Sequence, residues 1–143
     1  MKVQYINDEH FGIDPKLFTS KVKHLATLVN AYPGIVNAVF VNDKYIQALN
    51  KQYRKKDEPT DVLSFNYDLE EMGEDNLAGE VYISVETAQR QAEELNHSLQ
   101  DEVLRLLIHG LLHIHGYDHE TDEEYQEMNG LEKKVLGELA EKS

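Results

Sequence analysis

The feature that most constrains this sequence is an apolar segment, Val103 to Ile114, which carries two histidines and runs up to a glycine. Its apolar residues recur at the spacing of a helix that packs against a core: Val103, Leu104, Leu107, Ile108, Leu111 and Leu112. Ser98 is a typical helix N-cap, and Gly116 is a typical residue at which a helix stops. The segment therefore predicts a core helix that carries His109 and His113 on its surface.

Helical and strand-like patterns alternate along the rest of the chain, whose 143 residues suit one domain spanning residues 1–143. Asp14-Pro15 is a typical helix start, and Pro33-Gly34 a typical stop, so we expect a helix from Leu17 to Tyr32. The other expected helices are 43–53, 85–95 and one from 122 onward. Strands are expected around residues 3–5, 37–41, 62–65 and 81–83, with an acidic surface excursion at 66–79. These elements predict an α+β fold: a mixed sheet of about four strands with about five helices packed on it.

The composition excludes several classes of protein. Without cysteine, the chain has no disulfide, no thiolate metal site and no thiol nucleophile. No apolar run approaches the roughly 20 residues that cross a bilayer, and the first residues lack a signal-peptide pattern, so we expect a cytoplasmic enzyme that uses no membrane. A net charge of −13 argues against a protein that coats nucleic acid non-specifically. It leaves room for an RNA-processing enzyme with a local basic patch, such as residues 51–56 (KQYRKK).

Three histidines form the candidate metal site. His109 and His113 stand four residues apart, so on a helix they project from one face with Cβ atoms about 5–6 Å apart. Gly116 can turn the chain back and bring His119 to the same point. Three neutral imidazoles with an open fourth position are typical of a catalytic zinc site, although nickel, cobalt and copper also suit them.

The remaining four histidines are not expected to bind this metal. His115 lies two residues beyond His113 and points to another face of the helix. The other three have no partner nearby in sequence, and we expect them at the surface: His10, His24 and His97.

The same histidine spacing occurs in the extended protease motif H-E-x-x-H-x-x-G-x-x-H. Proteases of that class use the glutamate to take a proton from the water that attacks the peptide. This chain has Gly110 at that position, which offers no proton acceptor and lets another backbone or a substrate come close. A peptidase therefore loses its main support as an alternative.

Three stretches of the chain resemble one known family. His109 to His119 reads H-G-x-L-H-x-x-G-Y-D-H, which is similar to the histidine motif of the YbeY family of bacterial ribosomal-RNA maturation endoribonucleases. The stretches from Asn50 to Phe65 and from Gly79 to Ser84 also resemble the family, in which Asp is common in place of Glu80. Together they cover the middle and C-terminal two-thirds of the chain in the family's order.

The resemblance implies a zinc-dependent endoribonuclease that cuts single-stranded RNA in the maturation of small-subunit ribosomal RNA and in ribosome quality control. His109, His113 and His119 match the family's zinc ligands, and Arg54 matches the arginine regarded as catalytic, at the mouth of the metal cleft. Catalysis is therefore expected to rest on Arg54 and His109. The implied partners are ribosomal RNA and either ribosomal proteins or a maturation GTPase; DNA is not expected.

The chemistry of these residues agrees with that implication. A guanidinium can hold two oxygens of a phosphate that gathers negative charge, which suits Arg54. A bound metal would lower the pKa of a water and polarise the scissile phosphate, although attack by the RNA 2′-hydroxyl is an open alternative. Asp61 and Asp118 are candidates for orienting a ligand imidazole, and Asp118 is equally explained as shaping the turn after Gly116. No general base is identified by the sequence.

Two other functions are left open at this point. One is a metal-dependent peptidase without its glutamate. The other is a ribosome-associated binding module in which the metal only holds the C-terminal helices in place.

Overall fold

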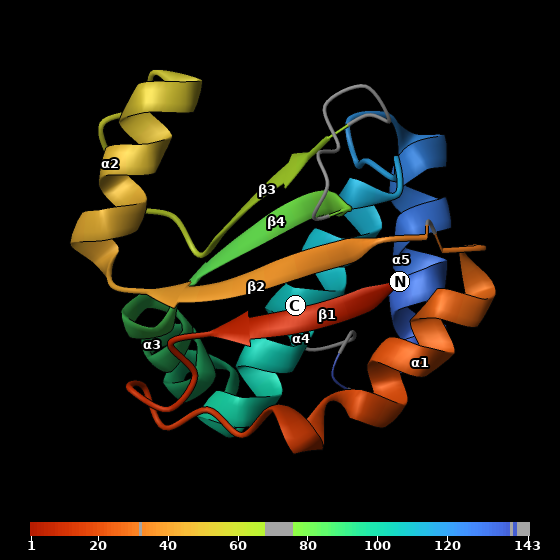
Figure 1. Cartoon of the computed structure of the whole chain (residues 1–143), viewed down its shortest axis with the longest axis horizontal. Helices are drawn as coiled ribbons and strands as arrows, with labels where there is room; N and C mark the ends of the chain where they lie inside the picture. The colour runs from red at the N-terminus through yellow and green to blue at the C-terminus, as the bar shows by residue number, and fades with distance from the viewer. Residues whose placement is uncertain (32, 68–75, 138, 140–143) are drawn as a thin grey trace.

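A computed structural model of the chain describes all residues except 32, 68–75, 138 and 140–143 (Figure 1). The described part contains these elements in chain order: β1 (Lys2–Ile6), the short 3-10 helix η1 (Pro15–Leu17), α1 (Thr19–Leu28), β2 (Ile35–Val41), α2 (Asp43–Arg54), β3 (Val62–Asn66), β4 (Leu77–Ser84), α3 (Val85–Leu95), α4 (Leu99–Ile114) and α5 (Asp122–Leu136). The predicted α+β fold, with a mixed four-stranded sheet and about five helices, is confirmed. None of the described helices is long and apolar enough to span a membrane.

The sheet has the strand order β1-β2-β4-β3. β1, β2 and β4 run parallel, whereas β3 runs antiparallel to β4 and forms one edge of the sheet. The central strands β2 and β4 are mostly buried, as expected for parallel strands that are covered on both faces. Since β3 is at the edge, no further strand of the described part of the chain lies beyond it.

Two apolar clusters lie on opposite faces of the sheet. The larger is formed by the sheet with α1, α3, α4 and α5, and the almost fully buried α4 runs behind the sheet in Figure 1. The smaller joins Val39, Val41 and Leu63 of the sheet to Ile46 of α2. The helix α2 therefore lies apart from the others, on the second face of the sheet.

Most of the predicted helix starts are confirmed by side-chain caps. Asn42 accepts a hydrogen bond from the Tyr45 amide at 2.8 Å and is the N-cap of α2. Ser84, Ser98 and Thr121 cap α3, α4 and α5 in the same way. The caps are local interactions, so the sequence shows them directly.

The predicted helix from Leu17 to Tyr32 was too long at both ends. Asp14 caps only the short helix η1. The buried Phe18 separates η1 from α1 and stands at the N-cap position of α1, where its side chain makes no capping hydrogen bond. At the other end α1 stops at Leu28, and Asn30 has a φ of 53°, which ends the helical path. The predicted end at Tyr32 lies outside the described residues.

The acidic excursion predicted at 66–79 was also wrong in its extent. β4 begins at Leu77, so the last three residues of that stretch belong to the sheet. Residues 68–75, which hold all of its acids, lie outside the described residues.

Candidate metal centre

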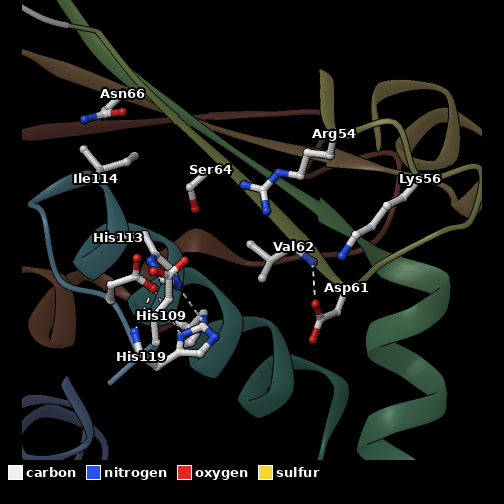
Figure 2. Close-up of a pocket in the computed structure, with 12 residues that line it drawn as sticks. Arg54, Lys56, Asp61, Val62, Ser64, Asn66, His109, His113, Ile114 and His119 are labelled. Carbon is white, nitrogen blue, oxygen red and sulfur yellow. Dashed lines mark hydrogen bonds and ion pairs between the residues drawn. The ribbon is translucent and has the colours of Figure 1, made fainter. Parts of the chain in front are cut away.

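Three imidazole rings meet at one end of α4. His109 and His113 come from that helix and His119 from the segment that follows it (Figure 2). Their ring centroids are 4.7 Å (109–113), 5.2 Å (113–119) and 5.6 Å (109–119) apart. One ring nitrogen of each lies within 4.8 Å of the others, so the three predicted ligands are brought together in the geometry of a candidate metal site.

The distance between the two helical nitrogens fits a shared metal. His109 Nε2 and His113 Nε2 are 3.2 Å apart. Two nitrogens bound tetrahedrally at about 2.0–2.1 Å from zinc would be about 3.3–3.4 Å apart, so little movement of these rings is needed. Burial, and then the nearby His109 and His119, lower the pKa of His113, which favours the neutral imidazole that a metal requires.

The turn after α4 delivers the third histidine. Gly116 has a φ of 92° and donates its amide hydrogen bond to the His113 carbonyl at 3.0 Å. The Tyr117 amide donates to the Leu112 carbonyl at 3.0 Å, which closes the helix end. Asp118 Oδ1 then accepts from the His119 amide at 2.7 Å. A backbone that favours glycine therefore lets the chain reverse and place His119 beside the helix.

Glu132 of α5 is a site residue that sequence reasoning missed. Its Oε1 lies 3.4 Å from His109 Nδ1, and the residue is only 8% exposed. A carboxylate at this position favours the tautomer with its proton on Nδ1, in which Nε2 is free to face the other two imidazoles. Nothing in the spacing could have found it, because the pair is 23 residues apart and meets only when α5 packs beside α4.

The two aspartates predicted as candidate orienting groups lie at the rim of the cleft. Asp61 accepts hydrogen bonds from the Val62 amide at 2.8 Å and from Gln91 Nε2 at 3.3 Å. Asp118 Oδ1 is 3.9 Å from His119 Nδ1, too long for a hydrogen bond, and its bond to the His119 amide is the turn-shaping contact. An orienting role for either aspartate stays a prediction.

A cleft of about 650 Å³ opens beside the histidines. Its lining is mostly polar: Arg54, Lys56, Asp61, Val62, Ser64, Asn66, His109, His113, Ile114, Asp118, His119 and Glu120. Figure 2 shows the Arg54 and Lys56 side chains on one side of the cleft and the three histidines on the other, with β3 between the two groups. The cleft therefore has a cationic wall facing a candidate metal site.

The end of α2 directs Arg54 toward this cleft. Lys55 follows it in the left-handed conformation, with a φ of 59°, and ends the helix. The buried Asn50 holds the next segment by donating from Nδ2 to the Glu58 carbonyl at 2.9 Å. Gln47 binds the same segment through Asp57 Oδ1 at 3.0 Å. These contacts fix where the helix stops and hence where the Arg54 side chain begins.

Gly110 is explained by close packing between α4 and the sheet. A Cβ added there would lie 2.7 Å from Val81 Cγ1 and 3.2 Å from Ser64 Oγ. The sheet packs directly against this glycine, so position 110 has no space for the glutamate side chain that a protease carries there. The chain thus lacks that general base, and its helix packing excludes it.

The histidines outside the site are placed as predicted with one exception. His10 and His24 are exposed. His115 is not in the candidate metal group, and its Nδ1 lies 2.8 Å from the Leu111 carbonyl oxygen.

The prediction that His97 lies at the surface was wrong. Its side chain is 2% exposed, and its Nε2 lies 2.7 Å from Oε1 of the fully buried Glu102. The turn between α3 and α4 folds His97 back onto that carboxylate, which Arg105 also binds at 2.6 Å and 2.9 Å. The contact between His97 and Glu102 could not be predicted from helical spacing, because it forms across a turn and not within one helix.

Known proteins are similar to this chain over most of its length. The family described as endoribonuclease YbeY matches residues 5–140. A curated endoribonuclease YbeY from Aquifex aeolicus is 46% identical over 130 residues, which cover 87% of this chain and 86% of the relative. The Bacillus licheniformis endoribonuclease YbeY is 46% identical over 146 aligned residues, which cover 92% and 90% of the two chains.

The fold also has a solved counterpart. The solution structure of TM1509 from Thermotoga maritima matches with a TM-score of 0.60 and 28% identity, and the match covers 95% of this chain and 90% of that one. The family match spans nearly the whole chain and includes all three histidines of the candidate site. This chain therefore belongs to the endoribonuclease YbeY family.

Proposed function

We propose that this protein is a zinc-dependent endoribonuclease that cuts single-stranded RNA and acts in the maturation of small-subunit ribosomal RNA and in ribosome quality control. The observation that carries the proposal is the cleft in which Arg54 and Lys56 face the three histidines. Membership of the endoribonuclease YbeY family supports the same reaction class.

His109, His113 and His119 would hold the metal, and three imidazoles with an open fourth position are typical of a catalytic zinc site. When bound, it supplies a Lewis acid that polarises the phosphate and makes a proton easier to remove from the attacking oxygen. Glu132 would accept a hydrogen bond from Nδ1 of His109 and so keep Nε2 of that ring available to hold the metal.

Arg54 acts on the other side of the reacting phosphate. Its guanidinium can donate two parallel hydrogen bonds to the non-bridging oxygens, where negative charge gathers in the transition state. Lys56 adds a second positive charge to the same wall and helps to hold the phosphate against the acidic background of the chain. The side chains of Ser64 and Asn66 line the cleft and offer hydrogen bonds to the ribose or base.

The substrate in the cell is proposed to be ribosomal RNA. A net charge of −13 gives the chain little general electrostatic attraction to RNA. Binding to ribosomal proteins or to a maturation GTPase would therefore bring it to its substrate. Pull-down of purified small-subunit precursors with and without their proteins tests this step directly.

The central experiment compares RNA, DNA and casein as substrates. The purified protein, loaded with zinc, is incubated with an end-labelled single-stranded RNA, the same sequence as DNA, and casein, each with and without chelator. We expect chelator-sensitive cuts in RNA alone. Arg54→Ala should lower the rate at least about 100-fold, since it removes a donor aimed at developing charge. Lys23→Ala, which removes an exposed cation of α1 outside the cleft, is the control.

The outcomes separate the three functions. RNA cuts that persist unchanged in both His113→Ala and Arg54→Ala would reveal a contaminating nuclease and remove the support for the proposal. Chelator-sensitive cleavage of casein alone would identify a peptidase. A large fall in melting temperature on chelation, without any cleavage, would identify a structural metal.

The same assay distinguishes the two nucleophiles. A 2′-deoxy substitution at the cut nucleotide blocks attack by the 2′-hydroxyl but not attack by water. Loss of that single cut, with the others retained, would assign the 2′-hydroxyl.

A further inference from the structure

Four aromatic side chains form a continuous row on the sheet face that carries α2. Tyr53 contacts Phe65 with ring centroids 5.2 Å apart, Phe65 contacts Tyr82 at 5.8 Å, and Tyr82 stacks on Tyr45 at 6.3 Å. We call these four residues the aromatic row. Two of them, Tyr53 and Tyr45, come from α2, and the other two come from β3 and β4.

The ends of the aromatic row are open to solvent. Tyr53 is 59% exposed and Tyr45 is 51% exposed, although both are large rings that proteins usually bury further. Phe65 and Tyr82 are half-buried and pack on the small cluster beneath α2. The inner pair therefore holds the outer rings in place while leaving much of their surface free for another planar group.

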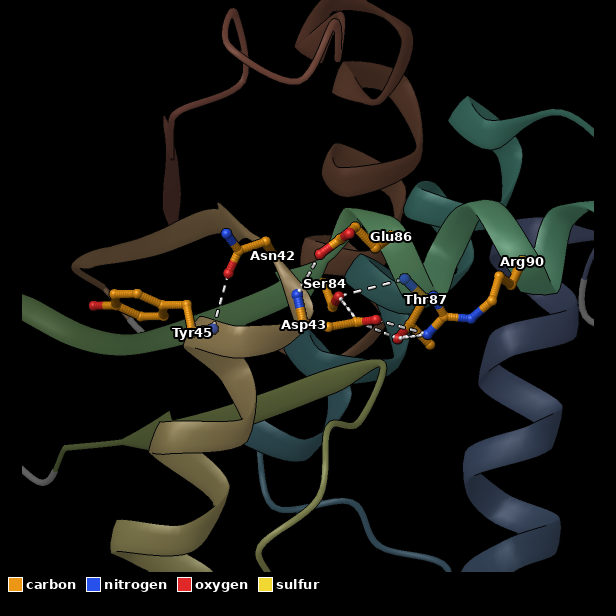
Figure 3. Close-up of polar contacts among 7 residues, drawn as sticks. All are labelled: Asn42, Asp43, Tyr45, Ser84, Glu86, Thr87 and Arg90. Carbon is orange, nitrogen blue, oxygen red and sulfur yellow. Dashed lines mark hydrogen bonds and ion pairs between the residues drawn. The ribbon is translucent and has the colours of Figure 1, made fainter.

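The helix that carries the outer rings is the basic part of an acidic protein. Residues 43–56 contain five of the 14 lysines and arginines and only one of the 27 acids. That acid, Asp43, accepts hydrogen bonds from Ser84 and Thr87 at 2.6 Å and pairs with Arg90 at 2.8 Å (Figure 3). Its charge is therefore directed into α3. Lys51 pairs with Asp57 just beyond the helix at 3.9 Å, and the other cations of residues 43–56 leave this surface with an excess of positive charge.

Among the described residues, the carboxylate of Glu80 lies near the aromatic row. Glu80 accepts hydrogen bonds from the hydroxyls of Tyr67 at 2.7 Å and Tyr82 at 3.1 Å. Both of its oxygens are thus engaged by tyrosines, which reduces its repulsion of a nearby phosphate.

The row continues the candidate active-site cleft around the edge of the sheet. Val62, Ser64 and Asn66 of β3 line the cleft, whereas the alternate residues Leu63 and Phe65 belong to the cluster on the α2 face. Because β3 is an edge strand, a polymer in the cleft can pass around it without crossing the sheet.

The helix α2 joins the same two surfaces. Arg54 lines the cleft and the preceding residue, Tyr53, begins the aromatic row. Tyr45 is eight residues away along α2, or about 12 Å, which is several times the roughly 3.4 Å rise of one stacked nucleotide.

We propose that the aromatic row and the lysines of α2 bind the unpaired nucleotides that flank the cut site, with bases stacked on Tyr53 and Tyr45. This inference rests on the proposed endoribonuclease function and adds a binding surface outside the metal cleft. Single strands are held on proteins by such rings beside a basic track, because every base presents a flat face and every nucleotide a phosphate. A duplex keeps its bases stacked inside and gains nothing from the row.

The test measures binding by fluorescence anisotropy and cleavage in parallel, with a long single-stranded RNA of about 16 nucleotides and a short one of about 5. Tyr45→Ala and Tyr53→Ala should each weaken binding of the long RNA about 5- to 150-fold. Tyr45→Ala should slow cleavage of the long RNA more than cleavage of the short RNA, because the short strand makes fewer contacts outside the cleft. Tyr45→Phe and Tyr53→Phe keep the rings and should bind as the wild type does, and thermal melting of all four variants checks that they fold.

The outcomes separate this inference from the proposed function. A wild type that cuts RNA, with alanine variants that bind the long RNA within about twofold of it, would overturn the aromatic binding surface and keep the nuclease. A wild type that binds through these tyrosines and cuts nothing would keep the surface and overturn the nuclease. If duplex RNA competes as well as the single strand, base stacking is refuted.

Discussion

Replacing Gly110 with alanine tests whether this glycine is present for packing. The residue is buried in α4, between the ligand candidate His109 and the core. The added Cβ would lie 2.7 Å from Val81 Cγ1 and 3.2 Å from Ser64 Oγ. The first distance is well below the roughly 3.5–4.0 Å at which two carbon atoms attract, and the second is a tight carbon–oxygen contact. Either the helix moves off the sheet or the side chains beneath it shift.

The expected cost follows from two opposing effects. Overpacking of a core typically costs about 1–3 kcal/mol. Alanine in place of glycine inside a helix stabilises the folded state by about 1 kcal/mol through its higher helix propensity. We therefore expect Gly110→Ala to lower the free energy of unfolding by up to about 2 kcal/mol. A larger loss is expected for Gly110→Glu, which would also bury a charge.

Gly130 of α5 provides a matched control. It is also a helical glycine, but a Cβ added there meets nothing within 4 Å. Gly130→Ala should therefore gain about 1 kcal/mol from helix propensity alone. The two variants should differ by about 1–3 kcal/mol, which for 143 residues corresponds to about 3–10 °C in melting temperature.

Urea and thermal unfolding, followed by circular dichroism on the metal-free protein, measure both variants. Val81→Ala combined with Gly110→Ala should cost less than the sum of the two single changes, because the shorter side chain removes the contact. If Gly110→Ala is as stable as Gly130→Ala, and the double variant shows no coupling, the packing explanation is refuted.

Three further predictions concern buried or charged groups. Arg105→Ala should cost about 3–5 kcal/mol in urea unfolding, because it leaves the fully buried Glu102 carboxylate short of its main cation; a loss below about 1 kcal/mol would contradict this. Burial would raise the pKa of Asp43, but three hydrogen bonds hold that pKa below its ordinary value. Asp43→Asn should therefore destabilise the folded protein at pH 7. The loss should shrink as the pH falls below about 4, because the wild-type carboxylate then also becomes protonated. An equal loss at pH 7 and at pH 3 would refute that sign. Glu132→Ala should weaken zinc binding about 10- to 100-fold in a chelator competition by freeing Nδ1 of His109, whereas unchanged affinity would show that this contact does not orient the ring.

Much of the fold could be predicted from the sequence because its signals are local. Apolar periodicity located α4, and Ser98 and Gly116 marked where that helix begins and where the chain turns after it. The first helix was misplaced because Asp14-Pro15 is a strong local start signal, while the burial of Phe18 that interrupts it depends on the assembled core.

The candidate metal group was predictable for the same physical reason. His109 and His113 share a helix face, and the turn at Gly116 places His119 beside them within a few residues. All of these relations are set by the geometry of one helix and the turn that follows it.

Only the tertiary structure decided what surrounds that group. It brings Glu132 from another helix to His109, and Arg54 and Lys56 from the far side of the sheet to the cleft. It shows that the space beside Gly110 is filled by Val81, which no spacing within the helix could reveal. Short-range geometry determines which residues can hold a metal, whereas the packing of α4 against the sheet and α5 determines which side chains orient it and which face it across the cleft.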